Sequence, residues 1–459
     1  MARLPLVVGM GGEQLTPSLQ ARRGGGRLEG MAPSARKLVV PVLLALAGTA
    51  LLAWLGLATA SFTDYELEAE PALAALRNGD LQGFLARLPA YGGSLILRSP
   101  FALAPDLWHG GDLALFRSMA APCLAAGAAL GVLLWARARK ARLPRSAAYL
   151  ALALCTVNPI TLRALETGHP EELLGGALCV AAALAALARR PVPAGVLLGL
   201  AVANKPWAVL AVVPVMLMLG RGHVRALVAA GAVATVLIAP MVLGGAAGVQ
   251  AAGRVAGDTG EIFQPWQVWW FAGEHGHVVR GLTAEKPGYR VPPPWISGVG
   301  HPIVILLGLL LSLACMRRLR ARPHEEALLL LAVVLVLRCL LDPWNITYYA
   351  LPFLLALAAW EVVGSERAPL LALAATVMTW VSFEQLPQLL SPDAQAAAYL
   401  AWSVPLAVVL TWRVLDPRGS RRAARRAAVA LRRLLPTLLA AGDGAASAGR
   451  PKADTARGR

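Results

Sequence analysis

Four carboxylates alternate along the seven-residue stretch "DYELEAE" (64–70) near the start of the chain. Residues four apart on a helix are neighbours, so a helix here places Asp64 and Glu68 on one face. A carboxylate beside a reacting hydroxyl acts as a general base. We predict Asp64 as the catalytic carboxylate, with Glu66 as the second candidate, and interpret Glu68 and Glu70 as a solvated acidic face.

A lysine and a proline interrupt an otherwise apolar run in "GLAVANKPWAVL" (199–210). A lysine in hydrocarbon costs about 2.5–3.5 kcal/mol, and a proline breaks the helix that it interrupts. We therefore expect Lys205 to lie within the protein and to face a polar pocket. The alternative is one long span whose lysine extends its charged end to the membrane surface.

A second charged residue in an apolar run is Arg338, four residues before Asp342 in "LRCLLDPWNITYY". One interpretation is a structural ion pair between these two side chains, because an unpaired arginine in a membrane is costly. The other makes Arg338 a clamp for phosphate at the outer end of its span, since the guanidinium group matches oxyanion geometry.

The short polar stretch "RALETGHPEELLGG" (163–176) holds one histidine and three glutamates. His169 is a candidate for binding a sugar hydroxyl or for moving a proton, and a capping or solvent-facing histidine is the alternative. The spacing matches no metal-binding motif, so we predict no metal site.

Aromatic side chains gather in "EIFQPWQVWWFAGEHGH" (261–277). Tryptophans at this density are typical of a membrane interface. Their faces also stack on sugars, which makes Trp269 a candidate for substrate binding.

These residues must be positioned by membrane helices. The chain of 459 residues is 57% hydrophobic and 15% charged, with a mean hydropathy of +0.59. Apolar runs of about 16–24 residues recur along it, the length that crosses a bilayer. We predict an all-α polytopic membrane protein with about 11–13 transmembrane helices. The five cysteines lie in apolar runs without paired spacing, so no disulfide framework is expected.

The predicted transmembrane domain covers 38–412, between a disordered basic N-terminus (1–37) and a basic tail (413–459). Its large external loops are 61–112 and 244–301. The tail contains "RRAARRAAVALRRLL" (421–435), either an amphipathic helix on the inner leaflet or a solvated disordered segment. The predicted spans are 38–60, 113–136, 146–162, 173–188, 224–243, 302–316, 326–341, 348–363, 369–384 and 397–412.

Charge sets the expected orientation. With these spans, 32 of the 43 lysines and arginines fall on one side, the side that holds both termini. The excess indicates the cytoplasmic side. The net charge of +17 therefore reflects the orientation of the chain in the cytoplasmic membrane, and no nucleic-acid partner is expected.

The segment 194–219 has cations at both ends, and its 26 residues make about 39 Å of helix. We predict a hairpin of two half-spans broken at 204–206.

The stretch 165–225 resembles polyprenyl-phosphate-dependent membrane glycosyltransferases of the GT-C superfamily, most closely glycosyltransferase family 87, the mannosyltransferase-like group of actinobacteria. A histidine, His169, stands where that family usually has glutamine, and "YGGSLILRSP" (91–100) replaces a tyrosine-proline-proline element. The matching positions are Gly168, Ala194, Gly195, Gly199, Leu200, Ala201, Lys205 and Pro206.

The resemblance implies an inverting transfer of mannose from a polyprenyl-phosphate sugar to a hydroxyl at the outer membrane surface. The acceptor is a glycolipid, a polysaccharide or a protein, and the lipid-linked sugar is a substrate, so no cofactor is expected. Asp64 would be the base, and Lys205, assisted by Arg338, would hold the donor phosphate.

A multi-pass transporter or lipid flippase is the alternative function, because transporters also place charged residues at broken helices. The absence of internal repeats weighs against it. A third interpretation is a catalytically inactive homologue that acts as an assembly partner in the membrane.

Overall fold

The computed structural model describes residues 33–58, 64–244, 263–274, 290–297, 300–319 and 326–417, with 419 and 422. The chain divides into units 1–40 and 41–459, and the smaller unit is described only for the start of α1 (Pro33–Ala58). Most of the expected disordered N-terminus, the amphipathic helix predicted in the tail and much of the loop 244–301 lie outside the described residues.

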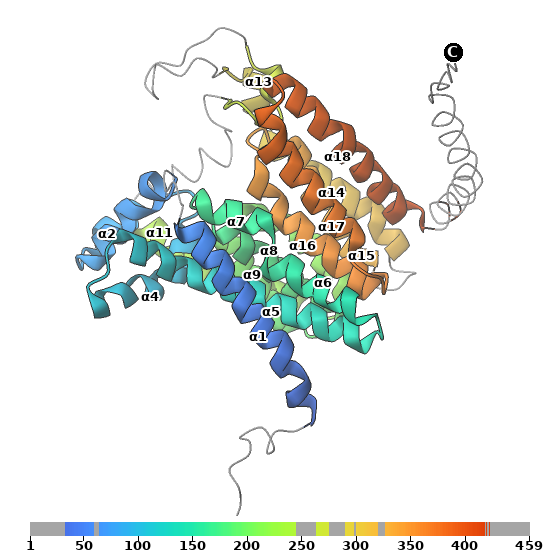
Figure 1. The fold of residues 1–459 in the computed structure, drawn as a ribbon, viewed down its shortest axis with the longest axis horizontal. Helices are drawn as coiled ribbons and strands as arrows, with labels where there is room; N and C mark the ends of the chain where they lie inside the picture. Colours follow the sequence, from blue (N-terminus) through green and yellow to red (C-terminus); the bar gives the residue numbers. More distant parts are fainter. Residues whose placement is uncertain are drawn as a thin grey trace, which may run out of the picture. The chain divides into compact units, whose positions relative to one another are not determined.

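The larger unit is built from two groups of packed helices (Figure 1). Helices α8 and α16 pack against each other and join the groups. The first group holds α5 (Asp112–Lys140), α6 (Arg145–Thr156), α8 (Glu171–Leu187), α9 (Pro191–Asn204) and α11 (His223–Leu243). The second holds α14 (Gly300–Leu319), α15 (Glu326–Leu341), α16 (Leu351–Ala359), α17 (Leu370–Trp380) and α18 (Pro392–Leu415).

Seven helices of the described chain are long and apolar enough to cross a membrane, and three shorter apolar helices accompany them. Helices α8 and α15 are almost completely buried and form the centre of the packing. Apart from two isolated bridges, the described residues form no strand pairs. The prediction of an all-α polytopic membrane fold is confirmed.

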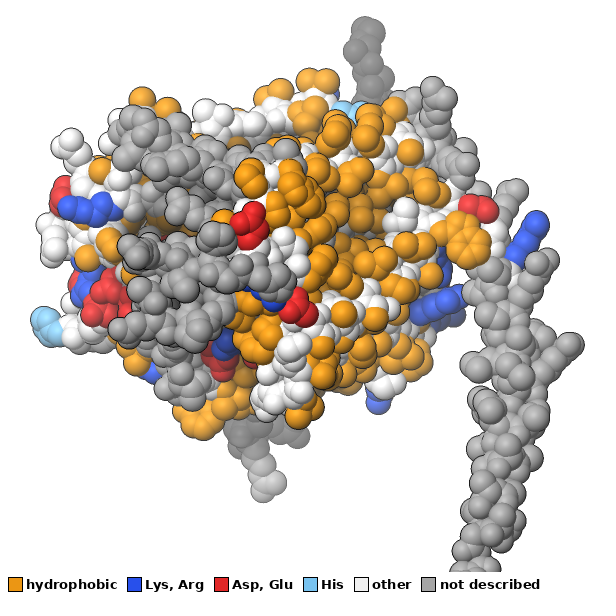
Figure 2. Space-filling model, turned by 90° about the horizontal axis from the view of Figure 1, so that it is seen from above, with side chains coloured by type: hydrophobic (Ala, Val, Ile, Leu, Met, Phe, Trp, Pro, Cys, Tyr) orange, Lys and Arg blue, Asp and Glu red, His pale blue; other side chains and the backbone are white. Residues whose placement is uncertain are grey.

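Helices at the margin of the packing expose apolar side chains instead of burying them. Val224, Val228 and Val236 of α11 and Leu306 and Leu310 of α14 are all exposed. A broad area of hydrophobic side chains is visible on the face shown in Figure 2. Contiguous exposed apolar surface of this kind suits contact with lipid.

The predicted hairpin at 194–219 is present. Helix α9 ends at Asn204, Lys205 is extended (φ −148°, ψ 129°), and the chain returns through η3 (Pro206–Ala211) and α10 (Val212–Leu219). After α10, a Cβ on Gly222 would lie 3.0 Å from Pro191, the first residue of α9. The two ends of the hairpin are therefore in contact. The break follows from the sequence, because a residue before proline is disfavoured in a helix.

The long segment 61–112, expected as a loop, is largely helical in its described part. It forms η1 (Tyr65–Ala69), α2 (Glu70–Arg77), α3 (Leu81–Ala86), α4 (Gly92–Ala102) and η2 (Ala104–Trp108). Helix α4 packs against α5 and α9. It approaches α9 closely at Gly93, where any side chain would collide with the Ala203 carbonyl.

The span expected at 146–162 is also divided, into α6 and α7 (Pro159–Glu166). The Asn158 side chain accepts a hydrogen bond from the Ile160 amide, and Pro159 occupies the first helical position. Asparagine at the cap and proline at the next residue both favour a new helix start. Helix α7 packs against η5 (Thr347–Ala350).

Candidate active site

A cavity of about 590 Å³ lies among the helix ends on one side of the larger unit. It brings together four of the six residues predicted from the sequence, which come from segments up to 274 positions apart. They are Asp64, His169, Lys205 and Arg338. Further titratable groups on the wall are Glu68, Glu172, His301 and Asp342. Tyrosines, tryptophans and glutamines add neutral polar groups, and Leu210, Val304 and Ile305 form an apolar part.

Asp64 lies at the start of η1 and faces the cavity beside His169. Its Oδ2 is 3.2 Å from His169 Nε2, and 44% of its side chain is exposed. Gly168 has φ +89°, and a Cβ there would lie 2.8 Å from the Tyr65 amide nitrogen. The backbone turn that brings His169 against η1 therefore needs glycine. The expectation that Asp64 and Glu68 share a face agrees with their presence on one cavity wall.

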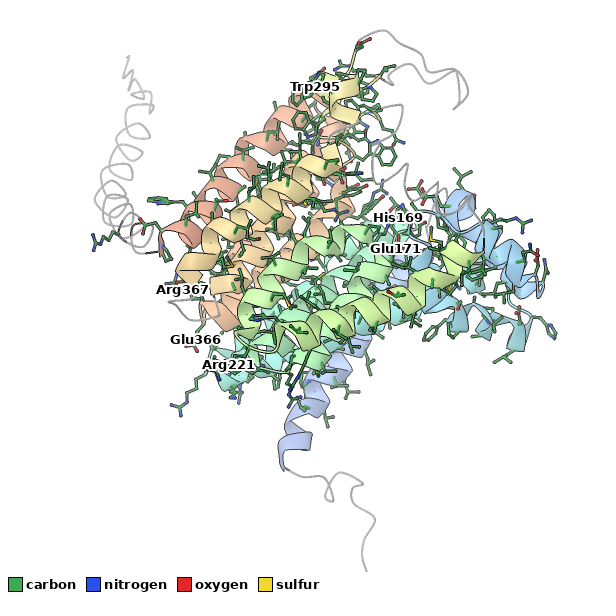
Figure 3. The ribbon with its side chains drawn as sticks, turned by 180° about the vertical axis from the view of Figure 1, so that it is seen from behind. His169, Glu171, Arg221, Trp295, Glu366 and Arg367 are labelled. Carbon is green, nitrogen blue, oxygen red and sulfur yellow. The ribbon has the colours of Figure 1, made fainter. Side chains whose placement is uncertain are left out.

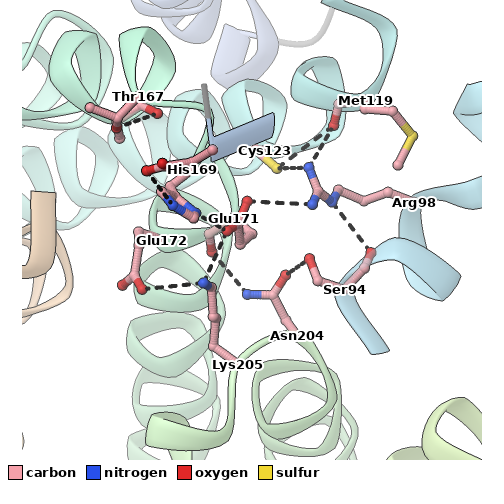
Figure 4. Close-up of polar contacts among 12 residues, drawn as sticks. Ser94, Arg98, Met119, Cys123, Thr167, His169, Glu171, Glu172, Asn204 and Lys205 are labelled. Atoms are coloured by element: carbon pink, nitrogen blue, oxygen red, sulfur yellow. Dashed lines mark hydrogen bonds and ion pairs between the residues drawn. The ribbon is translucent and has the colours of Figure 1, made fainter. Parts of the chain in front are cut away.

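Glu171 is the centre of the polar cluster (Figure 4). Its Oε1 is 2.8 Å from His169 Nδ1 and 3.0 Å from Lys205 Nζ, and its Oε2 is 3.4 Å from Arg98 Nη2. The Asn204 amide group donates to the Glu171 carbonyl over 2.9 Å, and Ser94 donates to Asn204. The carboxylate is 1% exposed, and its three ion-pair partners compensate for the loss of water.

Lys205, at the tip of the hairpin, faces the cavity with its ammonium group. Besides Glu171, the Nζ atom lies 3.9 Å from Glu172 and 4.0 Å from the centre of the Tyr91 ring. An aromatic face and two carboxylates hold the cation in place without enclosing it. The polar pocket expected around Lys205 is therefore present.

Arg338 does not form the local ion pair with Asp342 that helical spacing suggested. Its two terminal nitrogens bind the Glu172 carboxylate, each at 3.2 Å, and its guanidinium group lies over the Trp207 and Tyr349 rings. Asp342 instead lies 3.4 Å from His301 Nε2. The local interpretation was wrong because α8 presents a carboxylate that is nearer in space than the one on α15 itself.

Glu66 and Trp269 do not line this cavity. Glu66 is exposed. Trp269 donates its indole N–H to the Leu340 carbonyl over 2.9 Å and stacks on Phe271. The cavity near the aromatic stretch is instead lined by Gln264 and Gln267.

Sequence reasoning missed several residues of the cluster, above all Arg98, Glu171, Glu172 and Tyr91. A signal for them was present. Arg98 is the one charge in the segment 88–105, and Glu171 and Glu172 open α8, the most completely buried helix of the first group. Each is a charge that burial would make unfavourable unless it were paired.

Figure 3 shows that the ends of the larger unit differ in character. His169 and Glu171 lie apart from Arg221, Glu366 and Arg367, which gather at the opposite helix ends. The helix ends remote from the cavity carry Arg137, Arg139, Lys140, Arg142, Arg145, Arg189, Arg190, Arg221, Arg225, Arg367 and Arg413.

The ionisation of His169 leads to a prediction about pH. Burial opposes the imidazolium form, but the Glu171 charge and hydrogen bonds to Asp64 and Glu171 outweigh it and raise the pKa of His169 from 6.5 to about 9. A group whose pKa is higher in the folded state stabilises the fold below its unfolded pKa, and that stabilisation is lost as the pH rises through about 9. We expect the loss to be on the order of 3 kcal/mol.

The measurement is thermal unfolding of the purified protein in detergent between about pH 7 and about pH 10, for the wild type and for His169→Gln. The unfolding temperature of the wild type should fall more steeply across this range, because glutamine does not titrate. Parallel curves for the two proteins would contradict the raised pKa.

The fold is that of a multi-pass membrane protein, and carboxylate and cationic side chains line the same cavity. The sequence profile of glycosyltransferase family 87 matches residues 93–343, more than half of the chain. The chain belongs to glycosyltransferase family 87 and is a membrane glycosyltransferase. The matched range contains His169, Lys205 and Arg338, and Asp64 precedes it. No curated protein and no solved structure matches the chain.

Proposed function

We propose that this glycosyltransferase moves a sugar, mannose, from a polyprenyl-phosphate donor to an acceptor hydroxyl, with inversion at the anomeric carbon. The observation that carries the proposal is the single cavity whose wall holds both Asp64 and Lys205. A carboxylate and a fixed cation facing one space supply the two groups that glycosyl transfer from a phosphate requires.

In the proposed reaction, the acceptor oxygen attacks the anomeric carbon from the side opposite the phosphate. Its proton passes to the Asp64 carboxylate, and the bond between the anomeric carbon and the phosphate oxygen breaks. The electron pair of that bond stays on the phosphate, which leaves as polyprenyl phosphate. His169 contacts Asp64 at 3.2 Å and fixes the direction in which the carboxylate points.

The leaving phosphate gains negative charge as the bond breaks. A phosphate in the cavity can approach Lys205 more easily than Arg338. The Lys205 side chain is 12% exposed and lines the cavity, whereas the Arg338 side chain is 5% exposed. A cation already in place stabilises this charge at no reorganisation cost. Arg338 adds positive charge to the wall, although Glu172 occupies two of its nitrogens.

The apolar part of the wall supports a lipid-linked donor. Val304 and Ile305 on α14 and Leu210 on η3 line the cavity, and Ile305 is also 48% exposed. Ile305 therefore connects the cavity to the apolar exposed side of α14. A prenyl chain can follow this route while its phosphate stays beside Lys205.

Topology supports activity at the outer face of the cytoplasmic membrane. The cationic helix ends lie opposite the cavity, and cations favour the cytoplasmic side. In this orientation both termini are cytoplasmic and the cavity faces outward. The acceptor is proposed as a glycolipid, a polysaccharide or a protein. His169 helps to position it only through Asp64, because both ring nitrogens of His169 already contact carboxylates. Trp269 has no place in the proposed reaction, because it lies outside the cavity wall.

The test is transfer of radiolabelled mannose in membranes that contain the protein, with polyprenyl-phosphate mannose or a nucleotide-linked mannose as donor. We expect label in a larger glycoconjugate from the lipid donor alone. Transfer from the nucleotide donor in membranes free of polyprenyl-phosphate mannose would overturn the proposed donor class. Movement of the lipid across vesicles without a new glycosidic bond would favour a flippase.

A further inference from the structure

An aromatic cap, formed by residues 263–274 and 290–297, lies against the ends of α15 and α18. Two isolated antiparallel bridges join its two stretches. The side chains of Phe263, Trp270 and Ile296 form a hydrophobic cluster of their own inside it. The aromatic cap therefore has its own small core, and its position on the helices depends on the side chains that attach it to them.

Arg290 attaches the aromatic cap to the first turn of α18. Its two terminal nitrogens lie 2.9 Å and 3.0 Å from the two carboxylate oxygens of Asp393. Its Nη1 atom also donates to the Trp270 carbonyl over 3.0 Å, and its guanidinium group lies 4.3 Å from the centre of the Trp270 ring. Paired hydrogen bonds and a stacked ring fix both the distance and the direction of this contact. Trp269 adds a second attachment through the Leu340 carbonyl at the end of α15.

The turn that Arg290 holds also carries two glutamines of the cavity wall, Gln264 and Gln267. The Gln267 amide donates to the Gln264 carbonyl, and the Trp270 amide donates to the Gln267 carbonyl. Gln267 is 6% exposed, and its Oε1 accepts from the Gln264 amide over 2.9 Å. Because these bonds link the three residues in series, a displacement of Trp270 also displaces both glutamines.

We propose that Arg290 and Asp393 are positioning residues for sugar transfer, because they hold the carboxamide groups of Gln264 and Gln267 against hydroxyl groups of the donor sugar. The inference rests on the proposed function and adds the part of the wall that orients the sugar. A carboxamide both donates and accepts hydrogen bonds, as a hydroxyl does. The Gln267 oxygen is used within the aromatic cap, so its amide nitrogen is the group that donates to the sugar.

The place of the aromatic cap favours the sugar of the donor over that of the acceptor. Its last part, α13 (Pro294–Ser297), packs against α14. Helix α14 carries Val304 and Ile305, which line the proposed path of the prenyl chain. A sugar joined to that chain through its phosphate therefore lies on the side of the cavity that the glutamines line.

The test combines altered donors with altered residues. Transfer is measured with polyprenyl-phosphate mannose and with donors whose mannose lacks a single hydroxyl, other than the one next to the anomeric carbon. We expect kcat/KM of the wild type to fall about tenfold with at least one of these donors, because a hydrogen bond is lost. Gln267→Met keeps the side-chain volume without the amide. It should transfer intact mannose about tenfold more slowly and lose at most about twofold more when the same hydroxyl is removed.

Asp393→Asn tests the positioning role. Asparagine keeps the shape of aspartate and removes the charge that holds Arg290, and Asp393 does not line the cavity. A merely structural role would lower transfer from every donor by the same factor. We expect instead that the loss caused by the missing hydroxyl shrinks at least about threefold. Asp393→Glu retains the charge and should restore most of the dependence on that hydroxyl.

Gln385→Met is the matched control. Gln385 is exposed and lies outside the cavity wall, so this variant should transfer every donor as the wild type does. Thermal unfolding of each variant in detergent shows whether it is folded. Equal transfer of all the donors by the wild type would overturn the inference, and this comparison needs no variant to fold.

The remaining outcomes separate the parts of the inference. If folded Gln267→Met lost the same further factor as the wild type when the hydroxyl is removed, Gln267 would not bind that hydroxyl. An unchanged hydroxyl dependence in folded Asp393→Asn would remove the positioning role of the ion pair. A wild type that transfers no mannose even from the complete lipid donor would overturn the proposed function, and the inference with it.

Discussion

Asp64→Asn is expected to reduce sugar transfer about a thousandfold while changing the affinity for the lipid donor by less than about threefold. Asparagine has the shape of aspartate and can still accept a hydrogen bond from His169, so the wall of the cavity should keep its geometry. It cannot take the proton of the acceptor hydroxyl. The measurement is the initial rate of mannose transfer at saturating donor, together with equilibrium binding of the donor.

Asp80→Asn is the matched control. Asp80 lies in the same helical segment, does not line the cavity and caps α3 by accepting from the Gly83 amide. Asparagine caps helices as well as aspartate does, so this variant should transfer at the wild-type rate. If Asp64→Asn kept more than about a tenth of the activity, Asp64 would not be the base. Glu68 would then be the next candidate, because it lines the cavity and Glu66 does not.

The membrane-spanning helices could be predicted because each one depends on the apolar residues of its own segment. Twenty apolar residues in sequence cross a bilayer whatever the rest of the chain does. The hairpin at Lys205 was predictable for a similar reason, since proline and the charge distribution at its two ends are read directly from the sequence. The broken helix at Asn158 carried the same kind of signal, an asparagine followed by proline, within a run that looked long enough for one span.

The segment 61–112 was harder to predict, because its helices are short and their stability depends on packing. Helix α4 is fixed by contacts with α9, including the hydrogen bond from Ser94 to Asn204, 110 residues later. The hydrophobic periodicity of a segment does not indicate a contact with a residue so far along the chain. Short helices are marginal alone and form because a partner surface covers them.

The candidate site shows the same division between local and distant information. Lys205 stands out because it interrupts an apolar run, and Asp64 because it begins a run of four carboxylates just after a predicted span. The pairing of Arg338 with Glu172, 166 residues apart, was missed in favour of a neighbour four residues away. A single sequence shows that a buried charge needs a partner, but not which of several distant carboxylates the fold will bring to it.

Lys205→Met is expected to lower kcat/KM for the lipid donor by about 100-fold to 1,000-fold. Methionine fills a similar volume, so the loss should reflect the missing charge. The fold should tolerate the change, because Glu171 keeps Arg98 and His169 as partners and Glu172 keeps Arg338. Neither carboxylate is left as an unpaired buried charge, which is the usual cause of severe destabilisation.

The measurement is transfer kinetics over a range of donor concentrations, with Lys140→Met as the control. Lys140 is exposed at the end of α5 and is remote from the cavity, so its replacement should leave kcat/KM unchanged. A cation that acts mainly on the leaving phosphate should affect kcat more than KM, because the extra negative charge exists only as the bond breaks. A rise in KM alone would assign Lys205 to ground-state binding of the donor. Unchanged kinetics would remove Lys205 from the reaction and leave it as the structural partner of Glu171.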